Sequence, residues 1–258
     1  MKNKNFFYFN ILFAFVLMLA IPKQTKAQAN VNDSTISSFI VYVSYAYQIP
    51  GGDMADRFGN NSTIGPGLTY KTDKNWMFTI EGNYIFGNGT KNSDKIIADI
   101  ATSDGFVIGL DGTYTNIRPL EQGFTILAKV GKVIPVFNMN PNSGLAFNFG
   151  TGYIQHKISW DVEGNNAPQL AEDYKKGYDR FTEGLSLSQS IGLFYIGESH
   201  LWNFKVEAEV IESFTKTKRY NFDTHAGEPE NRLDLFYGLK VSWMVPLYGR
   251  APKDIYFY

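Results

Sequence analysis

LDLFYGLKVSWMVPL, residues 233–247, is the stretch of this sequence that decides its fold. Every second residue from Leu233 to Leu247 is apolar, whereas the alternate set includes Asp234, Lys240 and Ser242. A period of two predicts a β-strand with two unlike faces. The stretch is long for a strand of a soluble protein, which usually has about 5–6 residues. It suits a tilted strand that crosses a bilayer, which needs roughly 9–11 residues.

The same alternation recurs in seven other segments, so the sequence predicts eight strands. Their polar faces hold Gly and Ser as often as charge, which is unusual for a surface in water but fits a narrow barrel filled by its own side chains. We therefore expect an all-β fold, a transmembrane antiparallel up-and-down β-barrel, because a sheet in a bilayer must close. A secreted β-sandwich is the alternative. The seven segments are residues 39–49, 64–70, 76–86, 124–136, 145–153, 185–195 and 202–214.

The connections between these segments alternate in length, which predicts an orientation. Outer-membrane barrels have short periplasmic turns and long outer loops, so both termini are expected in the periplasm. Ten strands remain possible, because residues 106–110 and 113–117 flank Asp111-Gly112, a strong hairpin signal. We expect short helices at residues 91–102 and 170–177. The short connections are residues 72–75, 138–143 and 197–200, and the long ones are residues 50–61, 87–123, 161–183 and 216–231.

The start of the chain carries the signal of an exported protein. A basic start, an apolar run and a small-residue site predict a signal peptide, residues 1–27, that is removed. We then expect a periplasmic segment, 28–36, the barrel, 37–248, and a periplasmic tail, 249–258. Of the 24 basic residues, four lie in residues 1–27, which leaves 20 against 25 acidic residues and a net charge of −5. This charge argues against nucleic acid as a partner, and the absence of Cys excludes disulfides and thiol chemistry.

Seven charged residues fall on the polar faces of the strands and are expected in the lumen. A Lys on the lipid side would cost roughly 2–4 kcal/mol at the midplane. They could form a conduction path or a ligand cradle, but we favour a charge-paired plug, because buried charges require partners. The seven are Glu81, Lys129, Lys205, Glu207, Glu209, Asp234 and Lys240.

Catalytic and metal sites are weakly indicated. His156 could pair with Ser159, Asp161 or Asp179 in an outer-membrane enzyme, but no spacing matches a nucleophile motif or a metal pair. Asp223, Glu228 and Glu230 could hold calcium, but their spacing matches no ligand loop. We therefore expect no catalytic residue, no metal and no cofactor.

The outer loops are the predicted docking surface. Aromatic and Arg side chains anchor interfaces, and two loops are rich in them. The residues expected to dock a partner are Tyr174, Tyr178, Arg180, Arg219 and Tyr220.

Several segments carry a resemblance to a known group. NPNSG (residues 140–144), YKKGYDR (174–180), RLDLFYGLKVSW (232–243) and PLYGRAPKDIYFY (246–258), with the Ala27-Gln28 junction, resemble small outer-membrane β-barrel proteins of Bacteroidota, including the PorT-like group. The resemblance implies location in the cell outer membrane and a link to type IX secretion and gliding. It brings no catalytic motif.

We therefore expect a non-enzymatic outer-membrane barrel that is a scaffold or accessory subunit of a cell-envelope complex. Its expected partners are outer-membrane lipid and other envelope proteins. The alternatives are a narrow pore for ions or small solutes, and an outer-membrane enzyme that acts on lipid or glycan.

Overall fold

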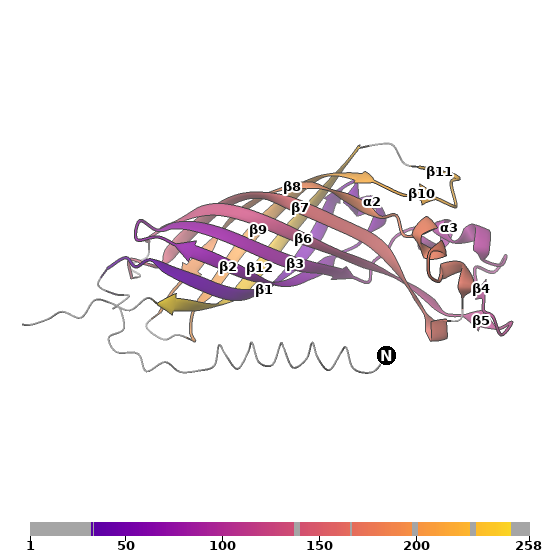
Figure 1. The fold of residues 1–258 in the computed structure, drawn as a ribbon, viewed down its shortest axis with the longest axis horizontal. Coiled ribbons are helices and arrows are strands. Elements are labelled where there is room, and N and C mark those ends of the chain that lie inside the picture. Colours follow the sequence, from indigo (N-terminus) through magenta and orange to yellow (C-terminus); the bar gives the residue numbers. More distant parts are fainter. Residues whose placement is uncertain are drawn as a thin grey trace, which may run out of the picture. The chain divides into compact units, whose positions relative to one another are not determined.

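The computed structural model describes residues 32, 34–136, 140–165, 167–197, 201–227 and 231–248. The predicted signal peptide and C-terminal tail lie outside these residues. The described chain forms a closed barrel with the strand order β1-β12-β9-β8-β7-β6-β3-β2 (Figure 1). Barrel strands that follow one another in the sequence pair antiparallel, from β1 through to β12, which is the up-and-down arrangement.

The barrel contains eight strands, which confirms the predicted fold class and resolves the choice between eight and ten. The hairpin around Asp111-Gly112 forms its own small sheet, β4 (Val107–Ile108) with β5 (Tyr114–Thr115), outside the barrel wall. The barrel strands are β1 (Ser38–Gly52), β2 (Asn61–Lys71), β3 (Trp76–Gly87), β6 (Ile117–Ile134), β7 (Gly144–Val162), β8 (Thr182–Tyr195), β9 (Phe204–Thr217) and β12 (Asn231–Tyr248).

Two strands extend furthest beyond their predicted bounds. β6 begins at Ile117, so residues 120–123, which were expected in a loop, belong to the wall. β7 continues to Val162. Both extensions lie beyond the apolar alternation, where Arg118, Gln122 and Asp161 replace apolar side chains. A strand that leaves the bilayer no longer needs an apolar outer face. The apolar alternation therefore ends, although the hydrogen-bonded pairing of the strands continues.

The second and third connections hold short helical segments near the predicted positions, and the first holds one that was not predicted. α2 (Met54–Arg57) lies in the first, and α3 (Ser93–Ile96) with η1 (Ala98–Ile100) in the second. The third holds η2 (Glu163–Asn165), η3 (Pro168–Leu170) and η4 (Tyr174–Gly177). The fourth forms a small hairpin that the sequence did not indicate, β10 (Tyr220–Asn221) with β11 (Ala226–Gly227). None of the helices in the described ranges is long and apolar enough to span a membrane.

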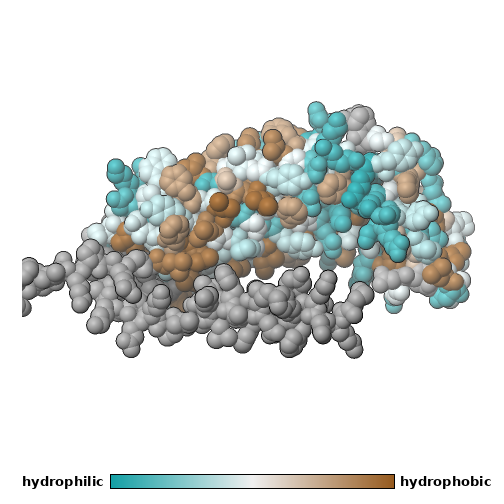
Figure 2. All heavy atoms as spheres, viewed as in Figure 1, coloured by the Kyte–Doolittle hydropathy of each residue, from teal (hydrophilic) through white to brown (hydrophobic). Residues whose placement is uncertain are grey.

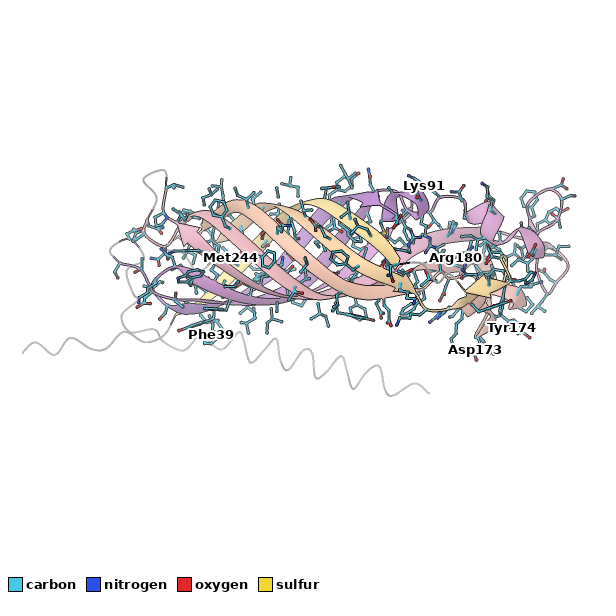
Figure 3. The ribbon with its side chains drawn as sticks, turned by 90° about the horizontal axis from the view of Figure 1, so that it is seen from above. Phe39, Lys91, Asp173, Tyr174, Arg180 and Met244 are labelled. Atoms are coloured by element: carbon cyan, nitrogen blue, oxygen red, sulfur yellow. The ribbon has the colours of Figure 1, made fainter. Side chains whose placement is uncertain are left out.

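The outward face of the wall is an apolar belt. Along β1, Phe39 to Ile49 alternate as exposed apolar residues with buried ones such as Ile40 and Ala46. Figure 3 shows Phe39 on the outside and Met244 toward the interior. On the face drawn in Figure 2, hydrophobic residues gather toward the end with the short turns, and hydrophilic ones toward the loops. Exposed apolar surface on this scale is stable only against lipid or another apolar surface.

Aromatic side chains concentrate at both borders of this belt, as in membrane-spanning barrels. At the turn end, strand pairing aligns Phe39 with Tyr70 and Phe204 with both Tyr195 and Trp243. Toward the loops, Tyr45, Tyr47, Tyr84, Phe86, Phe124, Tyr153, Phe214 and Tyr237 face outward. The belt and its aromatic borders are the exterior of a transmembrane barrel.

Candidate functional site: sealed lumen and loop cap

A neutral ionic layer crosses the lumen. Lys240 Nζ lies 2.8 Å from Glu81 Oε1 and 2.5 Å from Glu209 Oε2. Lys129 pairs with the same two carboxylates, at 2.7 Å from Glu81. Lys205 pairs with Glu207. Three Lys and three Glu carry no net charge. The layer comprises Glu81, Lys129, Lys205, Glu207, Glu209 and Lys240, all with side chains nearly or fully buried.

Hydroxyl groups donate further hydrogen bonds to the carboxylates of this layer. The hydroxyl of Tyr42 donates to Glu81 at 2.8 Å, and that of Ser188 donates to Glu209 at 2.7 Å. Ser190 donates to Glu207 at 2.5 Å. The ring of Tyr42 occupies the space where a side chain at Gly67 would lie, because a Cβ there would be 2.1 Å from Tyr42 Cζ. The abundance of Ser and Gly on the inner faces thus reflects close packing around the charges.

The seventh predicted lumen charge, Asp234, lies inside the barrel but outside the ionic layer. Its Oδ2 is 3.0 Å from His156 Nε2 and accepts a 2.5 Å hydrogen bond from Thr215. His156 packs edge-on against Phe58, with ring centroids 5.5 Å apart. Between this pair and the ionic layer, apolar side chains share the lumen with Gln48, Thr63 and Thr125, and the space left there is too small for a water molecule. The apolar side chains are Ile85, Leu127, Ile154, Ile211 and Phe236.

A turn seals the other end of the lumen. The side chain of Asn142 accepts hydrogen bonds from Lys71 Nζ at 2.8 Å and from the Ile36 backbone amide at 2.8 Å. It also donates to the Ser34 carbonyl at 2.8 Å. Lys71 is fully buried on the inner face of β2. The turn therefore ties the chain before β1 to the floor of the barrel.

The four long connections form a continuous cap over the loop end. From the first connection, Met54 and Phe58 are buried and pack in one apolar cluster with Ile96 and Ile97 of the second and Leu170 of the third. This cluster continues into the apolar part of the lumen. The cap therefore closes the barrel as a plug rather than a ring of free loops.

Polar contacts tie the first connection to its neighbours. Lys91 Nζ donates to the Ala55 carbonyl at 2.7 Å, which joins the first and second connections. The backbone amide of Leu233, in β12, donates to Asp53 Oδ2 at 2.7 Å, and Asp53 N donates to the Leu233 carbonyl at 3.0 Å.

Ion pairs tie the third connection to the fourth. Arg180 pairs with Asp223, and Arg219 pairs with Asp179. Burial raises the pKa of the Asp179 carboxyl above its usual value, and Arg219 opposes this effect. Tyr178 and Phe222 pack edge to face at 5.4 Å. These contacts hold the two connections as one body.

The five predicted docking residues divide into two groups. Tyr174 and Tyr220 are 67% and 53% exposed, and Tyr174 projects from the loop end (Figure 3). Tyr178 and Arg180 are buried, and the Arg219 side chain stacks over Phe181 while it pairs with Asp179. The buried and half-buried group assembles the cap, whereas Tyr174 and Tyr220 stay exposed. Arg and Tyr content alone could not separate these two uses.

The residues weighed for catalysis do not come together. His156 is buried and contacts Asp234, whereas Asp161 pairs with Arg118 at 2.6 Å and Asp179 pairs with Arg219. Of the three acids weighed for calcium, Glu228 and Glu230 lie outside the described residues, and Asp223 pairs with Arg180. Within the ranges that the structure covers, no group of three acids or His could hold a metal ion.

A polar pair on the outward face of the wall was not predicted from the sequence. Gln189 Nε2 donates to Glu212 Oε1 at 3.3 Å, and both side chains point outward from β8 and β9. Both residues occupy positions that the alternation assigns to the apolar face, so a residue-by-residue count along each strand would have predicted them to point outward. Glu121, buried inside β6, was also missed because it was assigned to a loop; it accepts a 3.0 Å hydrogen bond from Asn61.

No protein-family model matches the chain, and no curated protein matches it. Among solved structures it is similar to Ail, the attachment invasion locus protein of Yersinia pestis, at 9% identity and TM-score 0.44, over 81% of this chain and 99% of that one. It is similar to Neisserial surface protein A at 11% identity and TM-score 0.39, over 80% and 96%. It is also similar to the outer membrane protein OprG of Pseudomonas aeruginosa at 11% identity and TM-score 0.36, over 84% and 99%. At these values nothing about the function of this chain follows from them.

Proposed function

We propose that the protein is a non-conducting, non-enzymatic barrel of the bacterial outer membrane that serves as a scaffold or accessory subunit of a cell-envelope complex. The observation that carries this proposal is the plug: a neutral ionic layer fills the lumen and an apolar cap covers it. A barrel built in this way presents a rigid surface at its loop end.

Location in the outer membrane is supported by the wall. An antiparallel closed barrel with an apolar belt and aromatic borders is the form in which sheets span that membrane. The segments that resemble PorT-like proteins of Bacteroidota support a complex linked to secretion or gliding.

The ordered cap supports the docking role. Loops that only cover a barrel mouth do not need ion pairs between neighbouring connections, such as those of Arg180 and Arg219. A surface fixed before binding loses less conformational entropy when a partner docks. Tyr174 and Tyr220 supply exposed aromatic anchors on this surface.

A narrow pore is the second function considered, and the plug disfavours it. A conducting path would require an opening through paired charges such as Lys240 with Glu81 and Glu209. An enzyme is disfavoured because His156 lies under the cap with Asp234 as its partner.

Site-directed crosslinking in cells tests the proposal. Because the sequence contains no Cys, the introduced thiol is the one position of the protein that the reagent can label. Tyr174→Cys and Tyr220→Cys, labelled with a photoactivatable maleimide, are expected to capture an envelope protein identifiable by mass spectrometry. Tyr84→Cys, on the lipid-facing wall, is the matched control. Capture of no protein from either cap position, with normal barrel levels, would refute the docking role.

A further inference from the structure

A groove opens on the outward face of the barrel where the apolar belt ends. Its volume is about 260 Å³, and residues of β3, β6 and β7 line it together with Phe181 and Arg219 of the cap. Two of its lining residues, Tyr84 and Phe124, belong to the aromatic border on the loop side. The groove therefore reaches from the edge of the lipid-facing belt to the cap.

Three further lining residues are polar and lie just beyond the aromatic border. On β7, Gln155 and Lys157 are the next outward residues after Tyr153 toward the loops, and on β6, Gln122 is the next beyond Phe124. Strand pairing places Gln122 opposite Lys157 and Phe124 opposite Gln155. Aromatic borders of membrane barrels lie at the level of the lipid headgroups. The polar part of the groove thus lies at the headgroup level of the leaflet on the loop side.

The groove carries an excess of positive charge. Arg219 pairs with Asp179 and lies over the Phe181 ring at 4.7 Å. Lys157 favours the charged form of the same carboxylate but forms no ion pair with any acid of the described residues. Two cations and one carboxylate leave one positive charge without a counterion. The neighbouring ion pairs on this wall are neutral, and they are Lys218 with Glu183 and Arg118 with Asp161.

We propose that this groove binds the phosphate-bearing headgroup of an anionic lipid in the outer leaflet. The phosphate lies between Lys157 and Arg219, and the amides of Gln122 and Gln155 donate to its oxygens. A guanidinium has five N–H donors, so the phosphate shares Arg219 with Asp179. Hydrogen bonds from cationic donors to phosphate are stronger than those between neutral groups. A phosphodiester supplies the one negative charge that the groove lacks.

The position of the groove favours a lipid over a soluble anion. The groove opens on the side of the barrel next to the aromatic border, and not on the surface where Tyr174 and Tyr220 are exposed. A lipid matches both parts of it, because its headgroup meets Lys157 and its hydrocarbon continues along Tyr84 and Phe124. A free phosphate matches only the polar part. Basic pockets beside membrane-spanning segments bind lipid headgroups in this way.

Native mass spectrometry of the full chain in a nonionic detergent tests the proposal. The probes are phosphatidylglycerol, which is anionic, and phosphatidylcholine with the same acyl chains, which is zwitterionic. We expect phosphatidylglycerol to bind at least tenfold more tightly, and a hundredfold excess of glycerol phosphate to leave it bound. Equal affinity for the two lipids would overturn the proposal. Displacement by glycerol phosphate would show that the groove takes a soluble anion, which overturns the assignment to a lipid.

Variants separate the groove from the general charge of the wall. Lys157→Gln is expected to lower the affinity for phosphatidylglycerol at least fivefold and to leave that for phosphatidylcholine unchanged, whereas Lys157→Arg keeps the charge and should retain binding. Lys216→Gln is the matched control, because Lys216 is exposed and faces outward from β9 beyond Phe214 but does not line the groove. We expect it to change the affinity less than twofold. Circular dichroism verifies that each variant is folded.

Equal losses of affinity in Lys157→Gln and Lys216→Gln would show that the lipid responds to surface charge alone, and would overturn the site. The docking role of the cap is tested separately, because capture at Tyr174→Cys and Tyr220→Cys does not depend on these results.

Discussion

Removal of the Lys240 charge tests the ionic layer most sharply. In Lys240→Met the side chain keeps its length but loses its contacts with Glu81 Oε1 at 2.8 Å and with Glu209 Oε2 at 2.5 Å. Lys129 still contacts both carboxylates. The layer then carries a net charge of −1 inside a wall that excludes water.

The cost follows from leaving buried carboxylates short of a cation. Breaking a buried ion pair by removing one partner typically costs about 3–5 kcal/mol, because the remaining charge is uncompensated. We expect a loss of that size in the free energy of unfolding. In the double variant Lys240→Met with Glu209→Gln the layer is neutral again, and we expect the loss to shrink to within about 2 kcal/mol, since neutral replacements of a whole buried pair are often tolerated.

Urea titration of the barrel in phospholipid vesicles, followed by tryptophan fluorescence, measures these differences. Lys132→Met is the control: Lys132 faces outward at the turn end and lies over the Trp76 ring at 5.0 Å, where a charge is worth about 0–1 kcal/mol. A Lys240→Met variant as stable as Lys132→Met, or a double variant less stable than the single one, would refute the view that the lumen is a charge-paired plug.

Three other perturbations probe the wall, the packing and the cap. Leu239→Arg, on the lipid face of β12, should cost roughly 2–4 kcal/mol and reduce the inserted fraction of the protein. Ser242→Arg should instead crowd the lumen. Equal insertion of Leu239→Arg and the wild type would contradict the assignment of Leu239 to the lipid face. Gly67→Ala places a Cβ 2.1 Å from Tyr42 Cζ and should destabilise the barrel by about 1–3 kcal/mol through overpacking. The double variant Gly67→Ala with Tyr42→Phe should remain equally unstable, because the clash is with the ring. Full recovery of stability in the double variant would show that the clash is with the hydroxyl instead. Arg219→Met breaks the pair with Asp179 and should increase cleavage of the third and fourth connections in limited proteolysis, and an unchanged cleavage pattern would show that apolar packing alone holds the cap.

The wall could be predicted from the sequence because the bilayer imposes a strict rule on it. The alternation from Leu233 to Leu247 reports which side of the sheet meets lipid, and lipid depth is the same for every strand. Where that constraint ends, as in residues 117–123, the strand continues but its signal does not. The side of each lumen charge was likewise predictable, since Glu81 and Lys240 lie near the middle of their strands, where a charge facing lipid is costly.

The partners of those charges could not be predicted. Lys240 meets Glu81 of β3 across the barrel, and Asp234 meets His156 instead of the ionic layer. These contacts depend on register and on the tilt of the strands, which alternation does not specify. The sequence also does not show which residues of the cap are buried. Arg180 and Tyr174 are equal docking candidates in the sequence, and only the packing of the four connections buries Arg180 and exposes Tyr174.

Electrical recording from the purified full chain in planar bilayers tests the sealed lumen most directly. The plug of Lys129, Lys240, Glu81 and Glu209 under an apolar cap predicts a flat baseline across the voltage range, with insertion verified by protease protection. Reproducible unitary current steps from the wild-type barrel would contradict the account.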